Sequence, residues 1–132
     1  MKLIKWTLAS VFAASVWMTL TPAGIAEDEP IPEANPYSGD KKAIRSGRSW
    51  YRNVCSNCHG GRADGQGERG TGADLRKFNK GFQTFVQIVL DGRKVEGRLQ
   101  FMPSWRGVLK QEDIYQIGAY LETLAIDGAN WN

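Results

Sequence analysis

The sequence predicts an all-α fold in which three main helices are joined by long loops. Three segments carry apolar residues at helical spacing: about Lys41 to Asn53, about Phe82 to Asp91 and about Gln111 to Leu124. The segments between them are rich in glycine or in basic residues, and no alternation of polar and apolar residues predicts a β-strand. The length of 132 residues is enough for one domain.

The first predicted helix has a clear start and one unusual residue in its apolar stripe. Asp40 is a suitable N-cap residue, and Ile44, Gly47 and Tyr51 follow at positions i, i+3 and i+7. A glycine inside a helix costs about 1 kcal/mol relative to alanine. We therefore interpret Gly47 as a point where another helix comes close, in preference to a glycine that is merely tolerated.

The other two helices are predicted from the same periodicity. Phe82, Phe85 and Val89 form the stripe of the second helix, and Gly92 is expected to end it. The stripe of the last helix consists of Ile114, Ile117, Leu121 and Leu124.

The first 26 residues are predicted to form a secretory signal peptide. A basic start is followed by an uncharged apolar run, Leu8 to Leu20, and by the small residues of Gly24-Ile25-Ala26. The apolar run is shorter than the roughly 20 residues that span a bilayer. This favours cleavage after Ala26 over a retained membrane anchor, and so predicts a periplasmic protein with no membrane span after cleavage.

Residues 27–39 are predicted to be an extended lead-in, and residues 40–132 the folded domain. Pro30, Pro32 and Pro36 interrupt any helix in the lead-in, and its acidic residues keep it solvated. Two arrangements are open: the lead-in lies across the surface of the domain, or it is disordered.

Cys55-Ser56-Asn57-Cys58-His59 directly follows the first predicted helix. This spacing is the attachment pattern of a c-type haem. Each thiol bonds one vinyl group, so the two sulfurs must reach neighbouring edges of one flat ring, and one helical turn across C-x-x-C allows this. We therefore predict one covalent haem c, held by Cys55 and Cys58, with His59 as an axial iron ligand.

Other interpretations of these residues are weaker. A structural zinc site needs about four ligands, and a site made only of Cys and His would fall one short, because the chain has two cysteines and one histidine. A thioredoxin-like pair requires a βαβ context that the flanking sequence lacks. The remaining alternative is a disulfide beside an unrelated histidine.

Met102 is the predicted second axial ligand. It lies on a loop stiffened by Pro103, and the other two methionines, Met1 and Met18, belong to the predicted signal peptide. A lone methionine more often fills a core. Here a haem needs a ligand and no second histidine exists, and a His/Met pair is typical of electron-transfer cytochromes.

The loop after His59 is rich in glycine and is expected to fold tightly over the proximal face of the ring. One of its backbone carbonyls should accept a hydrogen bond from His59 Nδ1–H, which leaves Nε2 free for iron. The sequence does not identify which carbonyl this is.

Charge is unevenly distributed along the chain. Residues 41–110 contain 15 basic and five acidic residues, whereas residues 27–40 and 111–132 contain acids and no base. The basic middle is either ordinary solvated surface or a docking face for an acidic protein partner. The candidate docking residues are Arg62, Arg69, Arg76, Lys77, Lys80, Arg93, Lys94, Arg98 and Arg106.

From about Asp40 to Leu124 the chain resembles a class I c-type cytochrome. This resemblance implies that the first and last helices cross beside the haem at Gly47, with thioether bonds at Cys55 and Cys58 and axial ligands His59 and Met102. The family usually has Gly-Pro ahead of the leucine that follows the haem motif, whereas Gly72-Ala73-Asp74-Leu75 stands here. The resemblance rests on Gly47-Arg48-Ser49-Trp50-Tyr51, Cys55-Ser56-Asn57-Cys58-His59, Met102-Pro103 and Ile117-Gly118-Ala119-Tyr120-Leu121.

A narrower group is similar in four short motifs: periplasmic cytochromes that take electrons from PQQ-dependent methanol and alcohol dehydrogenases. The motifs are Asn35-Pro36-Tyr37, Leu75-Arg76-Lys77-Phe78, Met102-Pro103-Ser104-Trp105 and Ala129-Asn130-Trp131. This similarity implies a quinoprotein dehydrogenase as electron donor. It also implies a terminal oxidase or another cytochrome as acceptor.

The predicted function is therefore electron transport by a carrier that is not itself an enzyme. One alternative, a haem subunit of a larger oxidoreductase complex, would use the same site. The other, a haem enzyme or gas sensor, needs an open iron position, which a ligating Met102 would close. Nucleic acid is not an expected partner of an exported protein.

Overall fold

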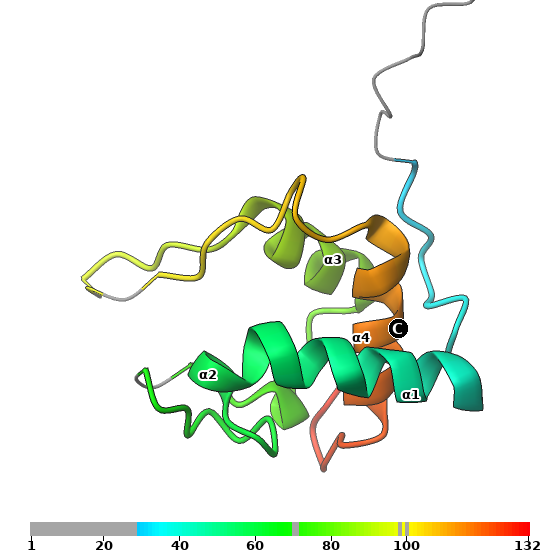
Figure 1. Ribbon diagram of the computed structural model, residues 1–132, viewed down its shortest axis with the longest axis horizontal. Coiled ribbons are helices and arrows are strands. Elements are labelled where there is room, and N and C mark those ends of the chain that lie inside the picture. Colours follow the sequence, from blue (N-terminus) through cyan, green and yellow to red (C-terminus); the bar gives the residue numbers. More distant parts are fainter. Residues whose placement is uncertain (1–28, 70–71, 98, 100) are drawn as a thin grey trace, which may run out of the picture.

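The computed structural model describes residues 29–69, 72–97, 99 and 101–132. The predicted signal peptide lies outside these residues. The all-α prediction is confirmed: the described residues contain no β-strand, and isolated β-bridges join Arg93 to Met102 and Arg106 to Leu109. The helices are α1 Lys41–Trp50, α2 Ser56–His59, α3 Phe82–Asp91 and α4 Gln111–Glu122, with a π-helical turn at Tyr51–Cys55 and a 3-10 turn at Leu75–Lys77 (Figure 1).

Helix α1 begins as predicted but ends at Trp50, before the predicted end at Asn53. The Asp40 carboxylate accepts a hydrogen bond of 2.7 Å from the Ala43 amide, which caps the first turn. The helical path does not stop at Asn53. It passes through the π-helical turn and then through α2, so one winding segment runs from Lys41 to His59.

Helices α1 and α4 cross in contact, and Figure 1 shows α4 passing behind α1. Gly47 lies at the crossing, because a Cβ atom built on it would be 1.8 Å from the Gln116 carbonyl oxygen. The interpretation of Gly47 as a point of close helix approach is therefore correct.

Helix α3 has the predicted bounds, and it ends at Gly92, whose positive φ of 76° is one that glycine readily adopts. Helix α4 ends at Glu122, two residues earlier than predicted. The core between the helices is aromatic and aliphatic. Its largest fully buried side chains are Tyr51, Phe82, Ile114, Ile117, Leu121 and Val86.

The C-terminal tail folds back onto the segment before α3. The Ile126 amide donates to the Arg76 carbonyl at 3.1 Å, and the Asn130 amide donates to the Phe78 carbonyl at 2.8 Å. These bonds place Trp131 in the core, where 8% of its surface stays exposed.

Residues 29–39 of the lead-in lie against the domain, which decides between the two arrangements left open by the sequence. Asn35 is buried, and its amide donates to the Tyr115 carbonyl and to a Glu122 carboxylate oxygen, both at 3.0 Å. The segment is not extended throughout, since a turn follows Asn35, with the Ser38 amide donating to the Asn35 carbonyl.

Candidate haem-binding site

The C-x-x-C-H motif lies where the helical path changes its winding. Cys55 closes the π-helical turn, and Ser56 to His59 form the single turn α2. Widened turns of this kind occur frequently at functional sites. The two thiols face different surroundings: Cys55 is partly buried and Cys58 is exposed.

Burial sets the chemistry of the Cys55 thiol. Burial and, to a smaller extent, the neighbouring Cys58 charge raise the pKa of Cys55 to about 12. The thiol is therefore neutral at ordinary pH. An uncharged thioether would suit the same apolar position.

Ala73 supplies the carbonyl that holds His59. The distance from His59 Nδ1 to the Ala73 oxygen is 2.9 Å. A carbonyl can only accept, so Nδ1 carries the proton and Nε2 keeps its lone pair for a metal. The acceptor that the sequence left open thus lies at the position where the resembling family has proline.

The glycine-rich loop packs directly on the motif, as predicted. The Gly72 amide donates to the Cys58 carbonyl at 3.0 Å, and the Gly65 amide donates to the His59 carbonyl at 2.8 Å. A Cβ atom on Gly72 would lie 2.5 Å from the Cys58 oxygen and 2.9 Å from His59 Nδ1. Glycine is required there because the loop backbone lies where a side chain would begin.

Tyr51 ties the end of the motif to the core. Its buried hydroxyl donates to the Gly60 carbonyl at 2.6 Å. Burial, together with the nearby Cys55, raises the pKa of Tyr51 above its ordinary value, so the hydroxyl remains a donor. The sequence marked Tyr51 only as a core residue. The hydrogen bond joins residues that are nine positions apart, and no sequence pattern indicated it.

Backbone hydrogen bonds and one from a serine side chain hold the loop of Met102 against the end of α3. Met102 and Arg93 exchange two of them, 2.8 and 2.9 Å long. The Trp105 amide donates to the Val89 carbonyl at 3.1 Å, and Ser104 Oγ donates to the Leu90 carbonyl at 2.5 Å. The position of Met102 is therefore fixed by the scaffold.

One pocket brings Cys55, His59 and Met102 together. Cys58, the fourth predicted site residue, is outside its lining and lies at the exposed end of α2. All other lining residues are apolar: Leu75, Phe78, Phe85, Ile88, Val89, Ile117 and Leu121.

This donor set fits a haem. The pocket offers an imidazole nitrogen and a thioether sulfur to a metal, with apolar walls for a macrocycle. Elsewhere among the described residues, no group of three His, Cys, Asp or Glu side chains could hold a metal ion. The fold and the pocket together define a c-type cytochrome.

Comparison with known proteins identifies the family. The family described as "Cytochrome C oxidase, cbb3-type, subunit III" matches residues 42–121. Cytochrome c550 of Pseudomonas aeruginosa is 30% identical over 111 residues, which are 82% of this chain and 74% of that protein. The chain belongs to this family of c-type cytochromes, and it carries a covalently attached c-type haem.

Two further similarities are more limited. The quinohemoprotein alcohol dehydrogenase ADH-IIG of Pseudomonas putida is 36% identical over 101 residues, covering 76% of this chain but only 13% of that enzyme. Cytochrome CL of the marine methylotroph Methylophaga aminisulfidivorans has a solved structure with a TM-score of 0.54 and 20% identity, covering 81% of this chain and 72% of that one. This structure supports the fold alone.

Proposed function

We propose that this cytochrome is a periplasmic electron carrier that takes electrons from a quinoprotein alcohol or methanol dehydrogenase and passes them towards a terminal oxidase. Carrier function itself follows from membership of the c-type cytochromes. The donor is proposed because one portion of a quinohemoprotein alcohol dehydrogenase resembles this chain, and because the fold is shared with cytochrome CL of a methylotroph.

In this proposal Cys55 and Cys58 would hold the haem by thioether bonds, and His59 and Met102 would bind its iron. The observation that carries the assignment is the apolar pocket that contains Cys55, His59 and Met102. When bound, the haem supplies a one-electron Fe(III)/Fe(II) couple. The chain orients the imidazole through Ala73 and keeps water out with its apolar walls.

The periplasmic address rests on the predicted signal peptide, with cleavage after Ala26 leaving residues 27–39 as the lead-in to the domain. Within the described residues, no helix is long and apolar enough to cross a membrane. N-terminal sequencing of the protein purified from the periplasm should begin at Glu27. A mature chain that begins at Met1 would contradict cleavage.

The donor is tested by stopped-flow reduction of the oxidised cytochrome with a purified quinoprotein alcohol dehydrogenase and its alcohol. Rapid reduction that depends on the alcohol supports the proposal. Absence of reduction would contradict the donor, while the carrier assignment would still stand on the family.

A second candidate function is that of a haem subunit in a larger oxidoreductase complex. The description of the matching family as an oxidase subunit favours it. Gel filtration of a gently solubilised cell extract separates the two possibilities: a carrier elutes near its own 14.7 kDa mass or below, and a subunit elutes with its complex. A haem enzyme or gas sensor is disfavoured, because Met102 would fill the position such a protein keeps open.

A further inference from the structure

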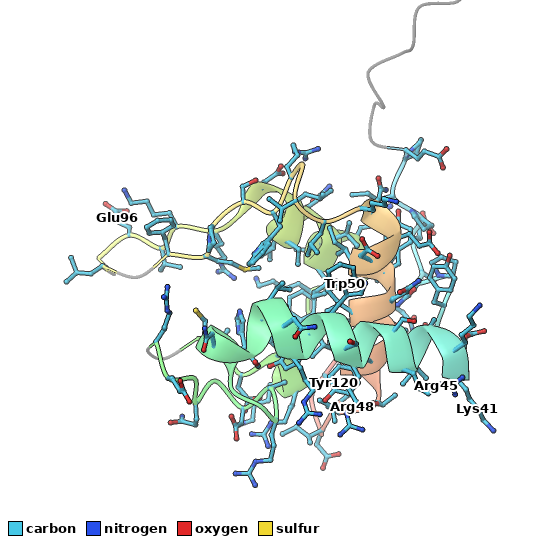
Figure 2. The ribbon with its side chains drawn as sticks, viewed as in Figure 1. Lys41, Arg45, Arg48, Trp50, Glu96 and Tyr120 are labelled. Carbon is cyan, nitrogen blue, oxygen red and sulfur yellow. The ribbon has the colours of Figure 1, made fainter. Side chains whose placement is uncertain are left out.

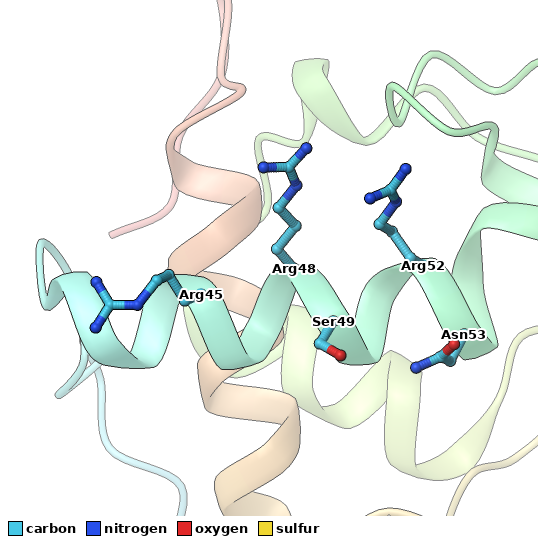
Figure 3. A pocket seen from close by; sticks show the side chains of 5 residues that line it. All are labelled: Arg45, Arg48, Ser49, Arg52 and Asn53. Atoms are coloured by element: carbon cyan, nitrogen blue, oxygen red, sulfur yellow. The ribbon is translucent and has the colours of Figure 1, made fainter.

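Three arginines form a line along the outer face of α1 and the π-helical turn. Arg45, Arg48 and Arg52 are spaced at i, i+3 and i+7, so they share one side of the helix. All three are exposed. Figure 3 shows Arg48 and Arg52 extending side by side from the helix, with Arg45 turned towards its first turn. We call these three residues the arginine row.

The arginine row has no counter-charge within the described structure. No acidic residue occurs between Lys41 and Ala63, and none of the three guanidinium groups is in an ion pair with a described residue. Arg62, Arg76 and Arg106, in contrast, pair with Asp64, Asp74 and Asp91.

Such a row weakens the helix on which it stands. Like charges three or four residues apart destabilise a helix by roughly 0.2–0.5 kcal/mol per pair. Lys41 adds a further positive charge at the first turn, and Figure 2 shows it projecting outward with Arg45 and Arg48. An anionic surface from outside would relieve this repulsion.

We propose that the arginine row is a docking surface for a carboxylate-rich face of a protein redox partner. Guanidinium groups bind carboxylates by two parallel hydrogen bonds, which gives orientation as well as attraction. Arg52 lies three residues before Cys55, so the row and the haem-attachment motif belong to one winding segment. This deepens the proposed carrier function and rests on it.

The first test uses poly-L-glutamate as a carboxylate-rich probe and the haem-loaded protein. NMR shift changes should map to α1, and the variant R45Q/R48Q/R52Q should bind the probe at least about tenfold more weakly. The comparison variant K77Q/K80Q/K94Q removes the same number of charges from exposed candidate docking residues outside α1 and should bind the probe more tightly than the row variant. Equal losses in both variants, or binding only to anionic phosphatidylglycerol vesicles, would overturn the docking surface.

The second test separates the surface from the donor. The same variants are reduced by the quinoprotein alcohol dehydrogenase at rising salt, where a steered encounter slows. A row variant that is slower at low salt, with an unchanged rate at high salt, supports docking on the row. If poly-L-glutamate binds α1 but the dehydrogenase reduces none of the proteins, the donor fails and the surface stands.

Discussion

The Gly47 backbone lies against the Gln116 carbonyl so closely that a Cβ atom on Gly47 would be 1.8 Å from the oxygen and 2.8 Å from the Ile117 nitrogen. The neighbouring atoms are backbone, so they cannot turn aside as a side chain could. Helix α1 leads into the haem motif, and α4 contributes Ile117 and Leu121 to the pocket. The crossing therefore sets the spacing between two parts of the site.

Gly47→Ala should lower the free energy of unfolding by at least about 1–3 kcal/mol through overpacking. Alanine favours a helix by about 1 kcal/mol over glycine. Any net loss of stability in Gly47→Ala must therefore come from the close contact with α4. Denaturant unfolding of the haem-loaded protein measures it. Gly61→Ala is the control, since nothing lies within 4 Å of its Cβ position. Equal midpoints for the two variants would contradict a tight crossing.

The sequence predicted the crossing because a glycine inside an apolar helical stripe leaves room for a neighbouring backbone at a cost in helix stability. It predicted Asp40 and Gly92 as helix ends because cap residues act locally. The π-helical turn before Cys55 and the Ala73 acceptor escaped it. The Ala73 acceptor depends on how the loop after His59 folds back onto the motif, and that arrangement is made by backbone groups distant in sequence.

Tyr51→Phe should destabilise the protein by about 0.5–1.5 kcal/mol, the usual net value of one hydrogen bond. The Gly60 carbonyl would keep its bond from the Ala63 amide, which limits the loss. Thermal unfolding is the measurement. In the control Tyr37→Phe, an exposed hydroxyl bond to Glu112 is removed, and little change is expected. Equal losses of stability in Tyr51→Phe and Tyr37→Phe would show that the buried hydrogen bond contributes no more than the exposed one.

The charge pattern was only partly interpretable from the sequence. Of the nine candidate docking residues, Arg62, Arg76 and Arg106 form ion pairs with nearby acids, and Arg98 lies outside the described residues. Pairing is decided by distance in space, which composition does not contain. Arg45, Arg48 and Arg52 were not predicted as docking residues for the same reason, since only the fold shows that they form no ion pair with a described residue.

Asp74 should contribute stability only above acidic pH. The Arg76 guanidinium, which donates to both of its carboxylate oxygens, lowers the Asp74 pKa below its ordinary value. The folded state therefore binds this proton less readily than the unfolded state. The contribution is complete above about pH 4, the unperturbed pKa, and is lost as pH falls through the lower folded pKa.

Asp74→Asn should accordingly flatten the acid limb of stability against pH. Unfolding free energies measured in steps below about pH 5 provide the comparison. Asp127→Asn, an exposed change in the tail, is the matched control and should keep the steep wild-type limb. If the stability of Asp74→Asn falls at acidic pH as steeply as that of wild type, the loss must come from other carboxylates.

Covalent attachment predicts that haem stays on the protein through acid-acetone extraction. The double variant Cys55→Ala/Cys58→Ala should release its haem, because no thioether bond remains to retain it. Each single variant should keep the pigment through its other cysteine. Absorbance of the precipitate and supernatant records the outcome. Haem that leaves the wild type would contradict attachment at these residues.

Met102→Ala should open one axial position of the iron. The reduction potential should fall, since a thioether ligand stabilises Fe(II) and axial ligands span about 0.8 V in haem proteins. Carbon monoxide should then bind the reduced protein readily, and the weak near-infrared sulfur–iron band of the oxidised protein should disappear. Leu99→Ala changes a fully exposed side chain on the same loop and should alter none of these three properties. A persistent sulfur–iron band in Met102→Ala would show that another group is the ligand.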